Sequence, residues 1–204
     1  MQKTENLLNE YAKRKKEIKQ RLSEFYKKGR GHKNHLFVEL CYCICTPLSK
    51  AEKVYKVINK ENKEQLLNSN KRNLSNFLKG NCRFHNNKAS YIVEARNFID
   101  YIKKLPKDGI EARDFIVQNV KGLNYKEASH FLRNIGYKNL AIIDGHILNS
   151  LKELGVIKSN ARPKNKKEYL NLENKIKDFS KDIKIPMDEL DLLLWSMKTG
   201  KVLK

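Results

Sequence analysis

Long apolar runs are absent from this chain of 204 residues. A membrane-spanning helix needs roughly 18 or more consecutive apolar residues, and no stretch of the sequence approaches that length. The first residues, MQKTENLLNEYAKRKKE, are charged and follow a helical pattern, so they do not resemble a secretory signal with its apolar centre. We therefore expect a globular protein of the cytoplasm that makes no use of a membrane.

Cysteine is scarce, with only Cys41, Cys43, Cys45 and Cys82 in the chain. These positions contain no C-x-x-C spacing, and no histidine-rich tract lies beside them. Structural zinc sites depend on such spacings, so we expect no metal site. The simplest interpretation is a set of buried free thiols in a reducing compartment.

Strand patterns are also missing. Apolar residues recur at helical spacing in nearly every segment, so we predict an all-α chain. The helices are interrupted at Gly29 to His32, at Thr46-Pro47 and at Pro106 to Gly109. Ser49 is expected to cap the helix that follows the second of these breaks.

Acidic residues are outnumbered, with 23 Asp and Glu against 43 Lys and Arg. The resulting net charge of +20 exceeds what solubility requires and favours a polyanionic partner. Nucleic acid is the partner that this charge indicates, with binding that weakens steeply as salt rises. A lysine-rich proteome without such a partner is the alternative explanation.

A short turn, Gly122-Leu123-Asn124, separates two helical segments. Glycine and asparagine tolerate positive φ, so we interpret these residues as a tight hairpin. A hairpin at a helix N-terminus points backbone N–H groups outward, where a DNA phosphate can bind without any reading of the base sequence. By itself the pattern also fits an ordinary turn or a non-catalytic DNA-binding module.

Two charged residues after the hairpin are candidates for catalysis. Lys126 lies in the first turn of the next helix, off its apolar face, where the helix N-terminus already carries partial positive charge. Asp144 comes 18 residues later and is suited to cap a helix from Gly145 to Leu154. Together they match the helix-hairpin-helix DNA glycosylases, in which a hairpin lysine is the nucleophile and a later aspartate assists.

Most of the chain resembles one branch of that superfamily, the compact second class of 8-oxoguanine DNA glycosylase/AP lyases of archaea and some bacteria. The resemblance implies two helical lobes with the active site in the cleft between them. We expect one lobe over 32–136 and the other over 1–31 together with 137–204. The matching stretches are 41–46, Arg83-Phe84, 88–93, 122–136, 141–144, Trp195 and 199–204.

The implied activity is bifunctional DNA repair, with excision of 8-oxoguanine and cleavage of the strand. The Lys126 amine would attack the anomeric carbon of the sugar, expel the base and form an imine, and β-elimination would then break the strand on the 3′ side. The amine must be neutral to attack, which a partly desolvated helix N-terminus favours. The Asp144 carboxylate would stabilise the positively charged transition state and help to move protons.

The resemblance also assigns residues to base recognition. In the family, an aromatic residue after an arginine and the tryptophan of the last helix sandwich the extruded base, and these positions match Phe84 and Trp195. A terminal carboxylate, which belongs here to Lys204, helps to recognise the oxidised guanine. Without the resemblance, both aromatic residues would be interpreted as core residues.

The expected partner is double-stranded DNA that contains 8-oxoguanine or abasic sites, bound by a monomer at a prokaryotic nucleoid. Backbone contacts are implied for Gly122, Leu123, Asn124 and His146. No cofactor is expected, because relatives that hold an iron–sulfur cluster carry four C-terminal cysteines and none follows Cys82 here. A monovalent cation at the hairpin carbonyls is compatible with the sequence.

Three positions depart from the family pattern. Asn124 replaces a usual second glycine, and we expect it to adopt the same conformation. Gly145 stands where an arginine or a bulky residue is common, which loosens a phosphate contact. Leu48 stands where an amide side chain is common, so it is either a lost polar contact or an apolar wedge. A glycosylase for another damaged base, or a non-catalytic helix-hairpin-helix module, are the alternative functions.

Overall fold

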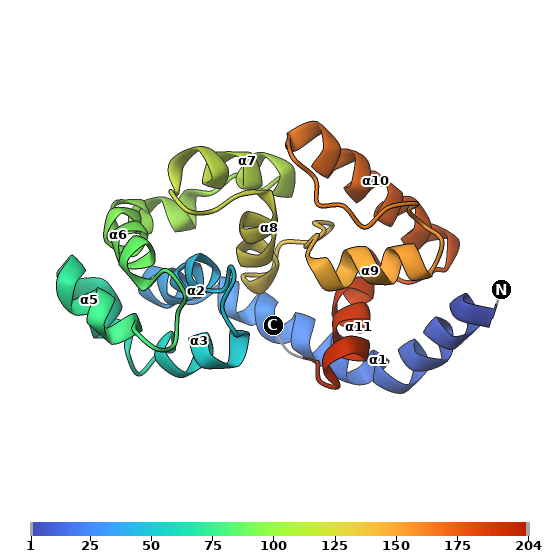
Figure 1. Cartoon of the computed structure of the whole chain (residues 1–204), viewed down its shortest axis with the longest axis horizontal. Coiled ribbons are helices and arrows are strands. Elements are labelled where there is room, and N and C mark those ends of the chain that lie inside the picture. Colours follow the sequence, from blue (N-terminus) through green and yellow to red (C-terminus); the bar gives the residue numbers. More distant parts are fainter. Residues whose placement is uncertain (1, 203–204) are drawn as a thin grey trace.

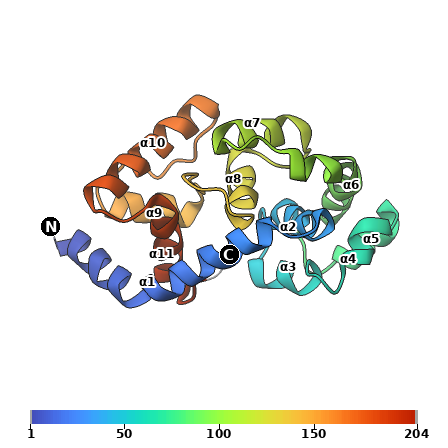
Figure 2. The same cartoon turned by 180° about the vertical axis from the view of Figure 1, so that it is seen from behind.

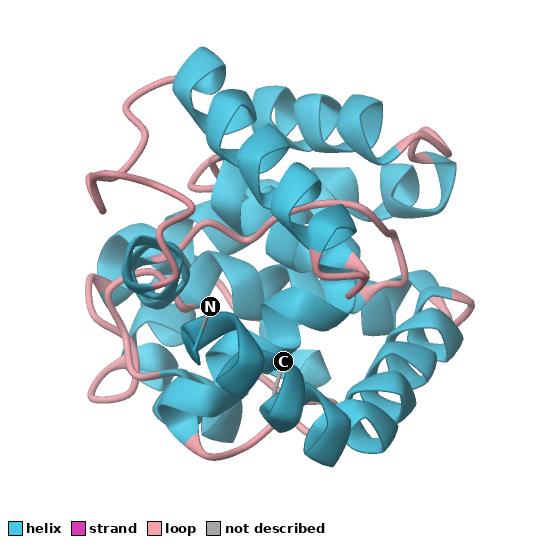
Figure 3. Ribbon diagram, turned by 90° about the vertical axis from the view of Figure 1, so that its right-hand side faces the viewer, coloured by secondary structure: helices cyan, strands magenta, loops and turns pink. Residues whose placement is uncertain are grey.

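The computed structural model describes residues 2–202, and within this range there are helices and loops but no strand (Figure 3). None of the helices in that range is both long enough and apolar enough to cross a membrane. The predicted all-α class is confirmed.

The elements are α1 (Gln2–Gly29), α2 (Lys33–Cys45), α3 (Ala51–Val57), α4 (Lys63–Asn68), α5 (Lys71–Leu78), α6 (His85–Ala95), the 3-10 helix η1 (Arg96–Lys104), α7 (Gly109–Asn119), α8 (Tyr125–Asn134), α9 (Gly145–Glu153), α10 (Lys166–Asp182) and α11 (Met187–Thr199).

The apolar core is divided into two clusters. One contains buried side chains from α2 through α8, and the other joins α1 to the segments after residue 140. Figure 1 shows the same division, with α2 to α7 on one side, α9 to α11 on the other and α8 between them. From behind, α1 runs beneath the α9–α11 half to the middle of the molecule (Figure 2). We propose on this basis the two lobes 32–136 and 1–31 with 137–204.

Two glycines let α1 approach the end of α8. A Cβ atom on Gly29 would lie 1.9 Å from the carbonyl oxygen of Ile135, which is closer than any real contact. Gly136 has φ +96°, and a Cβ there would lie 2.8 Å from the Cα of Tyr26. Both positions therefore require glycine for the backbones to meet, and this contact joins the two clusters.

The loop after α2 differs from the sequence prediction. Helix α2 ends at Cys45 as expected, but α3 starts after Lys50, whose side chain makes no capping hydrogen bond. Ser49 is not the cap, so that prediction is wrong. The physical reason is competition, because the Ser49 hydroxyl oxygen accepts from the Lys88 ammonium at 2.8 Å and from the Arg83 N–H at 3.0 Å.

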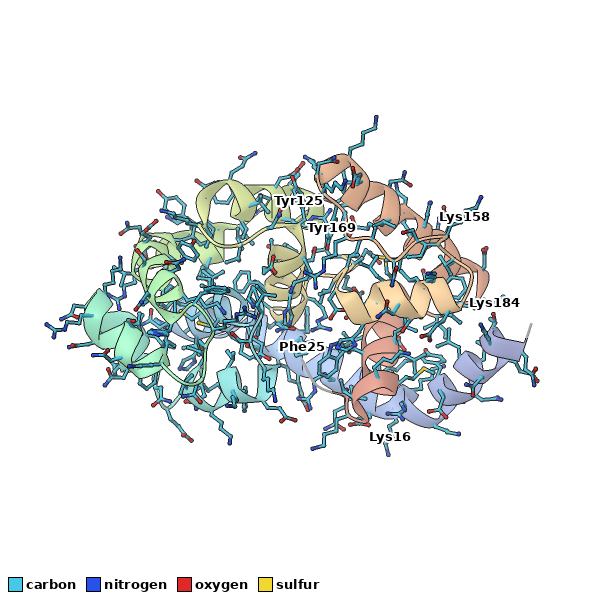
Figure 4. The ribbon with its side chains drawn as sticks, in the orientation of Figure 1. Lys16, Phe25, Tyr125, Lys158, Tyr169 and Lys184 are labelled. Carbon is cyan, nitrogen blue, oxygen red and sulfur yellow. The ribbon has the colours of Figure 1, made fainter. Side chains whose placement is uncertain are left out.

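A buried ion pair connects α7 to α10. The Arg113 guanidinium donates to both carboxylate oxygens of Glu173, at 2.7 and 2.8 Å, and to the Ser129 hydroxyl at 3.1 Å. Two tyrosine rings flank the guanidinium, at 5.5 Å for Tyr125 and 5.4 Å for Tyr169. Figure 4 shows both tyrosines at the junction of the two halves. The pair thus binds α7, α8 and α10 to one another.

The same carboxylate holds the segment that leads into α9. Glu173 accepts a third hydrogen bond, at 2.8 Å, from the backbone N–H of Ala141. The Tyr169 hydroxyl donates to the Ala141 carbonyl at 2.7 Å. Residues 141–144 have no regular hydrogen-bonding pattern of their own, so these contacts determine where the segment lies.

We expect Arg113→Met to lower the free energy of unfolding by about 3–5 kcal/mol, because it leaves the Glu173 charge buried and unpaired. Urea unfolding measures the change. Lys181→Met is the matched control, since Lys181 and Asp178 are both highly exposed and 3.7 Å apart. That pair should contribute no more than about 1 kcal/mol. Equal effects of the two substitutions would contradict the role given to Arg113.

Candidate active site

A cavity of about 320 Å³ lies between the two halves of the molecule. Its wall takes residues from both core clusters, including the ends of α2 and α9 and one face each of α8 and α11. The lining residues are Tyr42, Thr46, Ser49, Lys50, Ala51, Lys126, His130, Arg133, Ile142, Asp144, His146, Asp191, Leu192 and Trp195.

Lys126 reaches this cavity from the first turn of α8, directly after the hairpin. Gly122 has φ +89°, and a Cβ on it would lie 2.3 Å from the Tyr91 ring, so only glycine fits there. Asn124 behaves differently from the prediction. Its φ of −114° is extended, and its side chain caps α8 in a reciprocal capping box with Glu127. The expected left-handed asparagine is therefore wrong, because an N-cap residue needs extended backbone.

The Lys126 ammonium lies in an acidic setting. Its Nζ is 3.0 Å from the Glu127 carboxylate, and about a quarter of the side chain (28%) is exposed. Lys126 also lines a second cavity, of about 280 Å³, together with Asp144, Asn124 and Gly145. The lysine and the aspartate therefore form the partition between two adjoining cavities.

Asp144 is the N-cap of α9, as predicted. Its carboxylate accepts from the Ile147 N–H at 2.8 Å, and α9 begins at Gly145. One carboxylate oxygen is used for this cap, while the residue as a whole borders both cavities. Capping fixes the orientation of the carboxylate, so it is already in place when a substrate arrives.

The predicted base-binding residues are not all in one place. Trp195 lines the first cavity from α11. Phe84 is not among the lining residues; it is 53% exposed at the start of α6, and the Arg83 guanidinium lies 5.0 Å from its ring centroid. Lys204 lies outside the described residues. Leu48 borders the second cavity and is 63% exposed.

The hairpin, the lysine–aspartate pair and the tryptophan-lined cavity can now be compared with known proteins. A model of the family described as 8-oxoguanine DNA glycosylase matches residues 18–185. A Fusobacterium nucleatum protein named 8-oxoguanine DNA glycosylase/AP lyase is 41% identical over 208 residues, which cover 95% of this chain and 94% of its own length. The chain belongs to the 8-oxoguanine DNA glycosylase family.

Other family members agree over the same length. A Methanocaldococcus jannaschii protein with the same name is 39% identical, covering 92% of this chain and 91% of its own. The crystal structure of the Thermotoga maritima 8-oxoguanine DNA glycosylase has a TM-score of 0.92 at 33% identity, over 98% of each chain. The M. jannaschii glycosylase/lyase in complex with 15mer DNA containing 8-oxoguanine has a TM-score of 0.90 at 37% identity, covering 100% of this chain and 98% of its own. The predicted family and helix-hairpin-helix fold are confirmed.

Sequence reasoning missed several residues that line the cavity of this glycosylase. His130 and Arg133 lie four and seven positions after Lys126, so helical periodicity places them on the same face of α8. Asp191 lies four positions before Trp195 on α11 for the same reason. Counting along each helix from the two assigned residues would have found all three.

Asp191 has an unusual electrostatic setting. Burial raises the pKa of its carboxyl to about 7, although the Arg133 guanidinium, 2.7 Å away, opposes this effect. The negative charges of Asp144 and Asp188 raise the pKa further. The Arg133 guanidinium lowers the pKa of both Asp188 and Asp191 without outweighing their burial, so the wall of the glycosylase cavity can hold a proton on Asp191.

No group of three or more potential metal ligands lies together within residues 2–202. All four cysteines are buried free thiols. Burial raises the pKa of the Cys41 thiol, which keeps that thiol protonated and unsuited to metal binding at neutral pH.

Asp191 gives the fold a predictable pH dependence. Its carboxyl ordinarily titrates near 3.8, whereas burial raises the folded-state pKa to about 7. The folded protein therefore binds the extra proton in this window, and the associated stability is complete below 3.8 and lost as pH rises through about 7. In urea titrations between about pH 4 and 8, the free energy of unfolding of Asp191→Asn should decline less than that of the wild type. The exposed control Asp178→Asn should leave the slope unchanged, and a wild-type slope in Asp191→Asn would contradict the assignment.

Proposed function

We propose that the protein excises 8-oxoguanine from double-stranded DNA and then cleaves the strand at the resulting abasic site. The observation that carries this proposal is that Lys126, Asp144 and Trp195 line one cavity. The relatives named 8-oxoguanine DNA glycosylase/AP lyase, and the M. jannaschii complex with 8-oxoguanine DNA, support the choice of substrate. The net charge of +20 suits the polyanionic partner.

The proposed reaction starts at Lys126. Its amine attacks the anomeric carbon of the damaged nucleotide, and the bond to the base breaks. The sugar ring then opens at the C–O bond of the same carbon, the ring oxygen takes a proton, and the amine becomes an imine on the opened sugar. The Glu127 carboxylate contacts this amine at 3.0 Å. Loss of the neighbouring sugar proton then eliminates the 3′ phosphate. Asp144 stabilises the positive sugar in the transition state, because its capped carboxylate is already oriented.

We assign recognition of the base to Trp195, Phe84 and Lys204. Trp195 offers a flat face inside the cavity, and the exposed Phe84 ring offers a second one outside it. Val202, two residues before Lys204, is buried, and its carbonyl accepts from Arg21 on α1 at 3.4 Å. This anchor supports a role for the segment that carries Lys204. Stacking between aromatic faces is the usual way to hold an extruded base.

The DNA backbone is proposed to bind along the second cavity. Of the hairpin residues Gly122, Leu123 and Asn124, Asn124 lines this cavity, while His146, in the first turn of α9, lines the first cavity. Arg162 adds a charge, because its guanidinium Nη2 lies 3.9 Å from where a Cβ on Gly145 would be. A neighbouring arginine therefore borders the space that a side chain at position 145 would enter. Leu48 is proposed as an apolar wedge between bases, since it is exposed beside this cavity.

Side chains alone supply the nucleophile, the carboxylate and the stacking surfaces of this proposed reaction, so it includes no metal or organic cofactor. We propose that the protein acts as a monomer on chromosomal DNA in the cytoplasm. Excision of a different damaged base, or binding of DNA without any reaction, are the outcomes that would replace the proposal.

Borohydride should trap a covalent complex between the protein and duplex DNA that contains 8-oxoguanine, because reduction of the imine makes the link permanent. Lys126→Gln should abolish the trapped complex. Lys16→Gln is the control with the same change of charge, since Lys16 lies on the outer side of α1 and far from Tyr125 (Figure 4). Trapping that survives in Lys126→Gln would refute the nucleophile, and trapping with another damaged base alone would refute the substrate.

Trp195→Ala should weaken transition-state binding of the damaged base by about 1–3 kcal/mol, the usual contribution of one aromatic stacking contact. Single-turnover excision of 8-oxoguanine measures this loss. Cleavage at a preformed abasic site provides the comparison, because no base is present there to stack. Unchanged excision by a folded Trp195→Ala protein would show that the tryptophan is structural.

A further inference from the structure

Lys88 is a buried lysine on α6 that takes no part in the proposed reaction. Only 5% of the residue is exposed. Its ammonium donates to the Cys45 carbonyl at 2.6 Å, to the Pro47 carbonyl at 2.7 Å and to the Ser49 hydroxyl oxygen at 2.8 Å. All three donors of the ammonium are used, and all three acceptors lie at the end of α2 or in the loop after it.

This loop contains an unfavourable residue. Leu48 lies between two of the Lys88 partners, in a left-handed conformation with φ +56° that a branched side chain rarely adopts. Its side chain is 63% exposed, so burial of apolar surface does not offset the strain. Three hydrogen bonds from one buried charge hold the loop in this conformation.

A second strained turn lies directly before α6, the helix that carries Lys88. Phe84 also has φ +56° and is 53% exposed at the N-terminus of α6. The Lys88 backbone N–H donates to the Phe84 carbonyl at 3.1 Å, and the Arg83 N–H donates to the Ser49 hydroxyl at 3.0 Å. Lys88 and Ser49 therefore bind two strained turns together, and each turn exposes one large apolar side chain.

The loop that Lys88 holds, residues 46–50, also forms part of the wall of the active site. Thr46, Ser49 and Lys50 line the first cavity with Lys126, and Leu48 lines the second. Strained conformations that gain nothing by burial persist where the surrounding structure over-determines them, and such positions gather at binding sites. The hydrogen bonds of Lys88 and Ser49 maintain the strained backbone here. The result is that the Leu48 and Phe84 side chains are held facing outward.

We propose that Lys88 and Ser49 are positioning residues for base excision, which hold Leu48 and Phe84 in the orientation that receives the damaged nucleotide. This inference rests on the proposed function. Lys88 lines neither cavity, and we assign the effect of Lys88 and Ser49 to the two strained turns that they hold. A lysine whose only role was to satisfy the carbonyls at the end of α2 would instead affect the stability of the protein. Its loss would then change base excision and abasic-site cleavage to the same extent.

Ser49 gives the cleaner test. Burial lowers the pKa of Lys88, and the charge of Lys126 lowers it further, so removal of Lys88 would also alter the electrostatic setting of the nucleophile. Ser49→Thr and Ser49→Val form a matched pair of nearly equal shape, in which only threonine keeps the oxygen that accepts from Lys88 and Arg83.

Single-turnover excision of 8-oxoguanine from duplex DNA should fall about tenfold to a hundredfold in Ser49→Val, because a small misplacement of binding groups has effects of that size. Ser49→Thr should retain excision. Cleavage of a preformed abasic site should stay within about twofold of the wild type in both variants, since that substrate has no base to receive. Ser180→Ala, which removes a hydroxyl bonded to the Lys177 carbonyl on α10, is the control for loss of a serine hydroxyl.

Equal excision by Ser49→Thr and Ser49→Val, whether high or low, would overturn the proposal, because the accepting oxygen would then have no specific role. Equal loss of excision and abasic-site cleavage in Ser49→Val would overturn it as well. A wild-type protein that neither excises 8-oxoguanine nor forms a borohydride-trapped complex would instead refute the proposed function. If Ser49→Val does not fold, Lys88→Arg repeats the comparison with the charge kept, and it should show the same selective loss of excision because a planar guanidinium cannot reproduce three converging bonds.

Discussion

The buried pair of Arg113 and Glu173 is the contact on which the active site depends. It connects helices 60 residues apart in the chain, and Glu173 also receives the Ala141 N–H. Both charges are removed from water, so the pair depends on the hydrogen bonds that the two groups make with each other and with their neighbours. This condition fixes the short segment that ends in Asp144. Without it, the aspartate would have no defined position relative to Lys126, which belongs to the other core cluster.

A second set of buried charges crosses the same junction closer to the cavity. Lys28 on α1 contacts Glu39 on α2, Glu39 accepts from Asn134 on α8, and the neighbouring Arg133 pairs with Asp191 on α11. Opposite charges alternate along this path, so each one lowers the cost of burying the next. The path ends at the cavity wall, where Arg133 lowers the pKa of Asp188 and Asp191 but does not outweigh their burial. The contacts that join the two core clusters therefore lead to the carboxyl group with the raised pKa at the cavity wall.

Strain is concentrated on the side of the site that the proposed substrate would approach. Leu48 and Phe84 share the same left-handed φ, both are more than half exposed, and one buried lysine holds both turns. Of the other left-handed non-glycine residues described, Asn139 is of a type that accepts this conformation more readily, and Lys184 follows the end of α10, where a left-handed residue commonly closes a helix. A core built only for stability would not maintain large apolar side chains in this way. In our proposal, the two strained turns held by Lys88 and Ser49 serve base excision and not the chemistry at Lys126.

Local patterns in the sequence were enough to predict the helices, the hairpin and the cap at Asp144, because periodicity, capping and turn chemistry act over a few residues. The family was predicted from the resemblance of stretches spread over most of the chain. Local patterns could not predict that Ser49 would bind Lys88 instead of capping α3, because that partner lies 39 residues away and is brought close by packing. The cap formed by Asn124 was missed for another reason, since its partner Glu127 is only three residues away and the local capping-box pattern was overlooked. The assembly of Lys126, Asp144, Asp191 and Trp195 around one cavity was decided by tertiary structure alone, since it requires two separate cores to meet at a junction of glycines and buried ion pairs.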